Sequence, residues 1–294
     1  LLTSLKLCGV FVYRQPETYE KLPKETICLN WGYMPEQDEE QIKILADVGA
    51  TQYTCPGVCT WNRWIPLFKN AFYNINAMTR HALKYNAIGL LNTDWGDYAH
   101  ISHPSFSVPG IIYGAALAWN NSVSDFDAVN EGVSTLYYGD KTGKFMERLI
   151  ELSELEVFDW YHTVRWIEAK DSSEKEEFIK DFSVEAAEKA IEQMAKALSR
   201  LKAATINVEP EHRKILHYYE VNAEGAKIFN RIGICIKQGA DKEEKYELAE
   251  QLEKWFYNYS LMWRKVSKEG TLHNLRNLVI MYADFLRDRE INKN

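Results

Sequence analysis

The sequence lacks several features that mark particular classes of protein. No run of apolar residues reaches the roughly 18 that a membrane-spanning helix needs, and the 35 basic residues are interspersed among 42 acidic ones. The first ten residues lack the basic start, long apolar core and small-residue cleavage site of a secretory signal. We therefore expect a cytoplasmic protein that inserts in no membrane and binds no nucleic acid.

Familiar catalytic signatures are also missing. The sequence contains no Gly-x-Ser-x-Gly, no phosphate-binding glycine loop and no His-Glu-x-x-His. Cysteine is scarce and its count of five is odd, and Cys8 and Cys28 fall in apolar runs, which predicts reduced, buried thiols. Cys55 and Cys59 have no second pair at zinc-finger spacing. We expect neither a bound metal nor any other cofactor.

The composition is that of an ordinary globular protein. Of 294 residues, 46% are hydrophobic and 26% are charged, with a net charge of -7, which suggests one or two domains. Aromatic residues make up 13% and include nine tryptophans. That abundance fits a carbohydrate pocket and a large aromatic core equally well.

The first hundred residues alternate between strand and helix patterns. Such alternation with short loops predicts a parallel sheet, either half of an eightfold barrel or a small open sheet. Gly49 ends one helix in the usual C-terminal place. The strands are expected over residues 5–13, 26–31, 51–55 and 87–93, and the helices over 16–22, 36–48 and 64–85.

The sequence pattern of the remainder of the chain predicts helices. A small-residue helix is expected over 109–119, and Ser124 begins another with a capping residue. We therefore expect an α/β domain over residues 1–122, a partial (β/α) barrel of about four parallel units, and an α-helical bundle domain over 123–294. The long helices of the bundle are expected over 142–169, 184–202, 208–238, 242–267 and 270–289.

The stretch from Ala87 to His100 is the strongest candidate for a site. A short apolar run ends in Asn-Thr-Asp-Trp-Gly-Asp, as expected at the carboxyl edge of a parallel sheet, where ligands bind. Side chains two apart on an extended chain share a face, so Trp95 is expected beside Asp97. An indole and a carboxylate suit a sugar. The alternative is a buried tryptophan with two turn-forming aspartates.

Other aromatic residues follow the predicted strands. Tyr13, Trp31, Tyr53 and Trp95 stand at or near strand ends, and Trp61 lies in the loop after Cys55. Because parallel strands end at one edge of a sheet, we expect a stacking wall there.

A metal site is an alternative interpretation of the same region. Asp94, Asp97, His100 and His103 are suitable ligand types. Their spacing matches no specific metal motif, but a metal-assisted hydrolase using Asp94, Asp97 and His100 remains open.

A family resemblance links these features. Gly89 to His100 with Pro109 to Asn120 resembles the last strand and helix of the barrel in β-N-acetylhexosaminidases of glycoside hydrolase family 20. Cys28-Leu-Asn-Trp-Gly-Tyr33 is similar to the family's sixth strand, and Tyr53 to Trp61 to its seventh strand and loop. The helical tail is similar to the C-terminal domain of one branch of the family.

The resemblance implies a mechanism and residue roles. In the family, the acetamido oxygen of the substrate attacks the anomeric carbon in a retaining hydrolysis. By position, Tyr53 would hold the acetamido group, Trp31 and Trp95 would wall the pocket, and Trp61 would lie at its rim. The side chains that would bind sugar hydroxyls are Asp97 and Asp94. The expected ligand is a glycan that ends in N-acetylhexosamine.

Two departures from the family weaken the expected catalysis. The Asp-Glu pair that supplies the general acid would precede Leu1, and Glu17 and Asp38-Glu39 lie in predicted helices. Cys8-Gly-Val stands where the family has Trp-Gly-Asp. We expect little or no hydrolysis by this chain alone, and a homodimer or the missing barrel half as partner. The alternative is a non-catalytic interaction protein that acts through its helices, with a relic sugar pocket.

Overall fold

The computed structural model describes residues 6–122 and 124–289, which form two compact units. The α/β unit contains the residues up to 59, 67–95 and 107–133, and the helical unit contains 60–66, 96–106 and the residues from 134 onward. The predicted domain boundary at residues 122 and 123 stays a prediction. Each unit is described by itself.

A four-stranded parallel sheet forms the centre of the α/β unit. Its strands lie in the order β1-β2-β3-β4, so each strand pairs with the next one along the chain. The parallel sheet and the strand-helix alternation were both predicted, and the mixed α/β and helical class is confirmed. The strands are β1 (Lys6–Cys8), β2 (Ile27–Trp31), β3 (Thr51–Cys55) and β4 (Gly89–Leu90).

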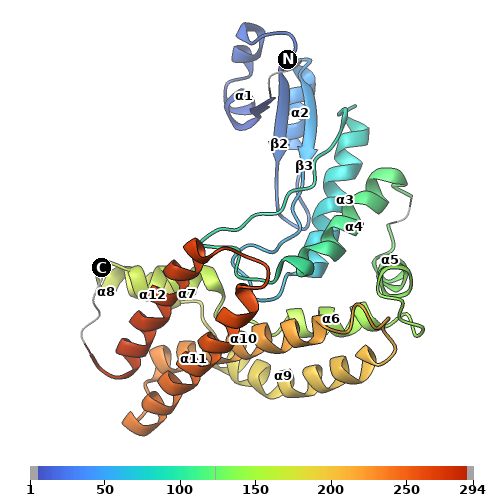
Figure 1. Cartoon of the computed structure of the whole chain (residues 1–294). Helices are drawn as coiled ribbons and strands as arrows, with labels where there is room; N and C mark the ends of the chain where they lie inside the picture. Colours follow the sequence, from blue (N-terminus) through green and yellow to red (C-terminus); the bar gives the residue numbers. More distant parts are fainter. Residues whose placement is uncertain (1–5, 123, 290–294) are drawn as a thin grey trace. The chain divides into compact units, whose positions relative to one another are not determined.

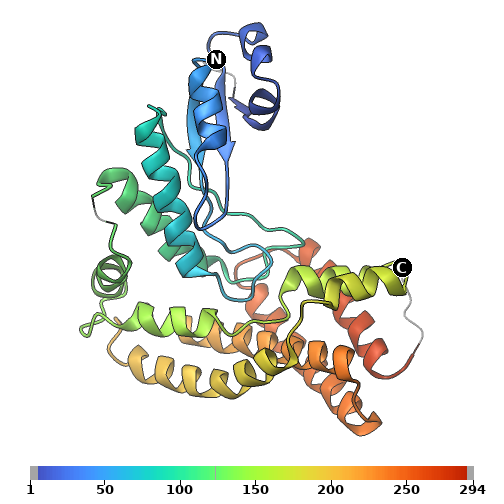
Figure 2. The same ribbon diagram turned by 180° about the vertical axis from the view of Figure 1, so that it is seen from behind.

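The two faces of the sheet differ in burial. Cys28, which packs against Val12 and Leu45, lies on the face that helix α2 (Glu40–Asp47) covers. Gln52 is on this face as well, and its side chain donates a 2.9 Å hydrogen bond to the Ile42 carbonyl. Helix α2 lies behind β2 and β3 in Figure 1 and in front of them in Figure 2. The alternate residues Leu29 and Tyr53 are only half-buried.

Apart from α1, the other helices of this unit follow the predicted order. Helix α3 packs against α4, with the Phe72 and Tyr113 rings edge to face at 5.4 Å. Gly49 ends α2 with a φ of +71°, as expected of a C-terminal glycine. The helices are α1 (Val10–Arg14), the 3-10 turn η1 (Pro16–Lys21), α3 (Phe68–Lys84), α4 (Val108–Trp119) and α5 (Phe126–Gly132).

The first predicted strand, over 5–13, is wrong beyond Cys8. Leu5 lies outside the described residues, and the chain turns into α1 after Gly9, whose carbonyl accepts the N–H groups of Val12 and Tyr13. A Cβ on Gly9 would lie 3.2 Å from both the Leu29 carbonyl oxygen and the Leu45 side chain. The turn buries Val12 in the core, and this tertiary packing outweighs the β propensity of the segment.

The described α-helices of the helical unit range from 8 to 24 residues. Several begin at capping side chains, since Asp159, Asp171, Ser183 and Asp241 each accept a backbone N–H three residues on. Helix α9 packs along both α6 and α10 (Figure 1). The helices are α6 (Phe145–Ser153), α7 (Trp160–Glu168), α8 (Ser172–Ile179), α9 (Val184–Thr205), α10 (Ile215–Gln238), α11 (Lys242–Trp263) and α12 (Glu269–Leu286).

The single helix predicted over 142–169 is two helices. Buried Asn230 of α10 accepts the N–H groups of Val157 and Phe158 and donates to the Leu155 carbonyl. Between α6 and α7, these side-chain bonds satisfy backbone groups that would otherwise be paired within a continuous helix. No described helix is long and apolar enough to cross a membrane.

Candidate functional site

Three aromatic side chains gather at the carboxyl edge of the sheet. Trp31, the last residue of β2, stacks on Tyr33 with ring centroids 5.4 Å apart and an interplanar angle of 16°. Trp95, beyond β4, meets Tyr33 edge to face at 6.4 Å. Trp31 is 43% exposed and Trp95 46% exposed, so both indoles present surface to a ligand. We call these three residues the aromatic edge.

Hydrogen bonds fix the two indoles. The Trp31 Nε1 donates to the Cys8 sulfur at 3.1 Å, and the Trp95 Nε1 donates to the Thr93 hydroxyl at 2.9 Å. The second bond agrees with the expectation that side chains two apart in this segment share a face. Burial raises the pKa of the Tyr33 hydroxyl, against a smaller lowering from its hydrogen bonds with Thr93 and Trp95. Tyr33 therefore stays a neutral phenol near pH 7.

Buried Asn74 of α3 shapes the loops around the aromatic edge. Its side-chain amide donates to the Gly32 and Met34 carbonyls at 2.9 and 2.8 Å, which brackets Tyr33. Its side-chain oxygen accepts the Gly57 N–H at 3.1 Å. One amide thus connects the segment after β2 with the segment after β3.

A second set of bonds connects the ends of β3 and β4. The Thr93 hydroxyl and N–H both donate to the Pro56 carbonyl, at 2.7 and 2.8 Å. Thr93 also accepts the Val58 N–H at 3.0 Å. Trp95 therefore extends from a segment that is bonded to the neighbouring strand end.

Tyr53 lies inside the sheet rather than at its end. It pairs with Leu29 on β2 and with Gly89 on β4, so it shares the half-buried face with Trp31. A Cβ on Gly89 would lie 2.6 Å from the Tyr53 ring, so only glycine leaves room for the ring there. The sequence signal for this contact is the glycine that opens the Gly89-Leu-Leu run.

The remaining predicted site residues divide between the units. Asp94 is exposed and precedes Trp95 in the α/β unit. Half-buried Trp61 and exposed Asp97 lie in loops 60–66 and 96–106 of the helical unit. Among the residues described, no three His, Cys, Asp or Glu side chains are arranged to share a metal ion, so the metal interpretation has no ligand set there.

Two predictions about individual residues need correction. Tyr13 does not end a strand, because it belongs to α1 and packs on the helix-covered side of the sheet. Cys8 is exposed, whereas Cys28 is a buried thiol as predicted, and burial raises its pKa. Tyr33 was missed, although it follows Trp31 by two residues and so keeps the alternation of the strand.

Glu39, at the start of α2, is held by Lys84 rather than poised as a general acid. Both oxygens of Glu39 accept hydrogen bonds of 2.7 Å from Lys84, and these bonds lower the pKa of Glu39. A general acid needs a raised carboxyl pKa. The aromatic edge can therefore stack a ligand against its rings, whereas its two indole N–H groups already donate to Cys8 and Thr93.

A search of protein-family models found no match to this chain, and no curated protein matches it.

Proposed function

We propose that this chain forms the sugar-binding half of a β-N-acetylhexosaminidase site of the glycoside hydrolase family 20 type. The observation that carries the proposal is the aromatic edge, with two indoles exposed at the carboxyl end of a parallel sheet. Ligands of parallel α/β proteins bind at this edge. Flat apolar rings suit the C–H faces of a sugar or an acetamido methyl group.

The strand order supports a partial (β/α) barrel. Each strand is added beside the preceding one in a single direction, whereas a doubly wound sheet reverses its order at a switch point. The face of the sheet that helix α2 covers fits the outside of a barrel wall. The opposite face, which bears Leu29, Tyr53 and Trp31, fits the inside. Four such units are half of the eight in a closed barrel.

The residue roles that we propose follow the family resemblance. Tyr53 holds the acetamido group, and Trp31 and Trp95 wall the sugar. Trp61 belongs to the rim, and Asp97 and Asp94 bind sugar hydroxyls. In substrate-assisted retaining hydrolysis, the acetamido oxygen attacks the anomeric carbon while an acid protonates the leaving oxygen. No Asp-Glu pair directly follows any of the described strand ends, so we expect weak or absent hydrolysis.

Sugar binding tests the proposal directly. N-acetylglucosamine, titrated by calorimetry, should bind the full chain saturably, and Trp31→Ala and Trp95→Ala should each weaken binding about tenfold or more, which corresponds to 1.4 kcal/mol. Trp119→Ala is the matched control, because Trp119 is 93% exposed at the C-terminal end of α4. The proposal would be refuted if all three variants lost the same amount of affinity for N-acetylglucosamine, or if the wild type showed no saturable binding of the sugar.

Hydrolysis is tested separately. A chromogenic N-acetylglucosaminide should be turned over slowly or not at all, with Asp97→Ala as the comparison. Efficient turnover by this chain alone would show that our account of the missing acid is wrong.

We further propose a partner that completes the barrel, either a second copy of this chain or the missing half. Among the described strands, β1 and β4 each have only one neighbour, and open strand edges favour association. Sedimentation velocity should show a dimer if a second copy is the partner. We place the protein in the cytoplasm, because Cys28, Cys55 and Cys235 are buried thiols.

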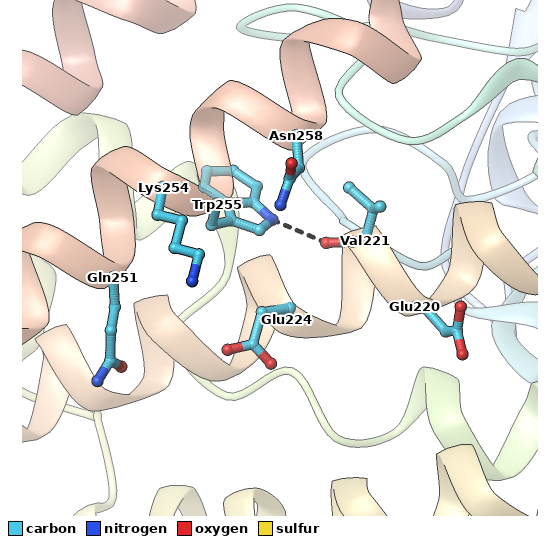
Figure 3. Close-up of a pocket in the computed structure, with 7 residues that line it drawn as sticks. All are labelled: Glu220, Val221, Glu224, Gln251, Lys254, Trp255 and Asn258. Atoms are coloured by element: carbon cyan, nitrogen blue, oxygen red, sulfur yellow. Dashed lines mark hydrogen bonds between the residues drawn. The ribbon is translucent and has the colours of Figure 1, made fainter.

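The alternative function is a helical interaction protein with a relic sugar pocket. A hollow of about 350 Å³ between α10 and α11 favours it. Figure 3 shows the Trp255 indole of α11 donating to the Val221 carbonyl of α10. The rest of the lining consists of Glu220, Glu224, Gln251, Lys254 and Asn258. Under this alternative, saturating N-acetylglucosamine leaves the melting temperature unchanged, whereas a true sugar site raises it.

A further inference from the structure

Loop 60–66 is built into the core of the helical unit. Trp64 is 1% exposed, and its indole is surrounded by four aromatic rings from three helices. The ring centroids of Trp160 and Trp255 lie 5.1 Å away, that of Tyr259 lies 5.5 Å away and that of Phe229 lies 5.6 Å away. Such aromatic pairs stabilise a core beyond the burial of their surface.

The backbone of this loop is bonded to the segment around Glu156. The Trp64 N–H donates to Glu156 Oε2 at 3.0 Å, and Arg63 Nε lies 3.3 Å from the same oxygen. Arg63 also donates to the Ser153 carbonyl at 3.1 Å, and the Trp160 N–H donates to the Asn62 carbonyl at 3.2 Å. The loop therefore has its conformation set by contacts with the helical unit.

Loop 96–106 is held by the same helices. The Trp160 indole donates to the Tyr98 carbonyl at 2.9 Å, and the Tyr259 hydroxyl donates to the Ile101 carbonyl at 2.7 Å. Further along, His103 stacks on Tyr218 with ring centroids 3.7 Å apart. Helices α7, α10 and α11 thus each contact this loop.

Two side chains therefore contact both loops. Trp160 and Tyr259 each pack against Trp64 in one loop and each donate a hydrogen bond to a carbonyl in the other. Trp61 lies three residues before Trp64, and Asp97 precedes Tyr98. We infer that Trp160 and Tyr259 are positioning residues that fix the loops carrying Trp61 and Asp97. Only the consequence for sugar binding rests on the proposed function.

The Tyr259→Phe variant isolates this role, because it keeps the ring beside Trp64 and removes only the hydroxyl bonded to Ile101. Tyr282→Phe is the matched control: Tyr282 is also fully buried, in the same aromatic core, and its hydroxyl donates to the Thr163 carbonyl within α7 at 2.6 Å. Both variants lose one buried hydrogen bond, but only one of these bonds reaches a loop.

Hydrogen exchange measured by mass spectrometry on the full chain decides the inference. Tyr259→Phe should speed deuterium uptake in peptides spanning 96–106 about tenfold, as expected when one stabilising hydrogen bond is lost from a local opening. Tyr282→Phe should leave those peptides at the wild-type rate. Equal uptake in the two variants, or no change in Tyr259→Phe, would overturn the inference.

Sugar binding provides the second readout. Tyr259→Phe should weaken N-acetylglucosamine binding by at least about threefold more than Tyr282→Phe, because one loop that carries a proposed sugar contact is loosened. If the wild type binds no sugar, the proposed function fails, but loop exchange still decides the role of Tyr259. If the wild type binds N-acetylglucosamine and both variants bind it with the same affinity, Tyr259 does not position the sugar contacts.

Discussion

The Trp64 N–H donates a 3.0 Å hydrogen bond to a Glu156 side chain that is only 2% exposed. Burial raises the pKa of Glu156 to about 7, and nearby Arg63 opposes that rise. The carboxyl therefore changes charge inside the contact that holds loop 60–66, within the physiological pH range.

The first prediction concerns the pH dependence of stability. Because the folded pKa of Glu156 lies above its ordinary value of 4.5, its contribution is complete below about pH 4.5 and is lost as pH rises through 7. The loss is about 3 kcal/mol by linkage, at 1.36 kcal/mol for each pKa unit. Glu156→Gln should remove most of this dependence, as measured by urea unfolding at pH 5 and pH 8.

Neighbouring charges must be separated from Glu156 in that experiment. Asp159 faces Glu156 from the start of α7 and is bonded to His162, whose pKa that bond raises, so His162 also loses its stabilising contribution as pH rises. The His162 contribution is the same in the wild type and in Glu156→Gln. It therefore cancels when the two plots of unfolding free energy against pH are subtracted. Glu147→Gln, at an exposed carboxylate, should leave the curve unchanged. A Glu156→Gln curve parallel to the wild type would contradict the prediction.

The second prediction concerns the contact between Gly89 and Tyr53. Gly89→Ala places a methyl group 2.6 Å from the Tyr53 ring and should lower the free energy of unfolding by about 1–3 kcal/mol. Combining it with Tyr53→Leu should cost less than the sum of the two single changes, because the smaller side chain makes room. Gly270→Ala, where a Cβ meets no atom within 4 Å, should cost nothing. Additive costs in denaturant titrations would count against a direct clash.

Local patterns predicted some elements well. The strand Thr51–Cys55 has the predicted bounds, because alternating burial and the following Pro56-Gly57 are both encoded nearby. The aromatic edge was predicted in part for the same reason, since Trp31 and Trp95 follow strand patterns. Tyr33 could have been found by continuing the alternation of β2 for two more residues.

Tertiary contacts explain what the sequence could not predict. Trp64 was expected to open a helix, but α3 begins at Phe68, because Trp64 is buried among rings contributed by α7, α10 and α11. The break between α6 and α7 likewise depends on Asn230, which lies far along the chain on α10. No local periodicity carries information about such distant partners.

The third prediction concerns the amide that shapes the aromatic edge. Asn74→Ala leaves the Gly32 and Met34 carbonyls and the buried Gly57 N–H without their partner, which should cost about 2–4 kcal/mol. The near-ultraviolet circular dichroism of Trp31 and Tyr33 should weaken as their loop loosens. Asn76→Ala, at a half-buried position on the same helix, should change neither measurement. An unaltered aromatic spectrum in a destabilised Asn74→Ala protein would mean that Asn74 does not order the edge.

The fourth prediction concerns acid sensitivity at His103. Burial, with a smaller effect from Lys214, lowers the pKa of His103 to about 4, so protonation opposes its packing on Tyr218. Its contribution to stability is present above pH 6.5 and is lost as pH falls through 4, the reverse of the Glu156 effect. His103→Gln should therefore lose less stability than the wild type between pH 7 and pH 4.5 in urea unfolding.

The control for this prediction is His273→Gln, at an exposed position on α12, which should follow the wild-type curve. Hydrogen exchange separates the two titrations, because His103 lies in loop 96–106 and Glu156 is bonded to loop 60–66. After correction for the intrinsic pH dependence of amide exchange, peptides from 96–106 should lose protection in acid, and peptides from 60–66 should lose protection above pH 7. If both loops loosen together at one end of the pH range, a single shared group controls them and the separate assignments are wrong.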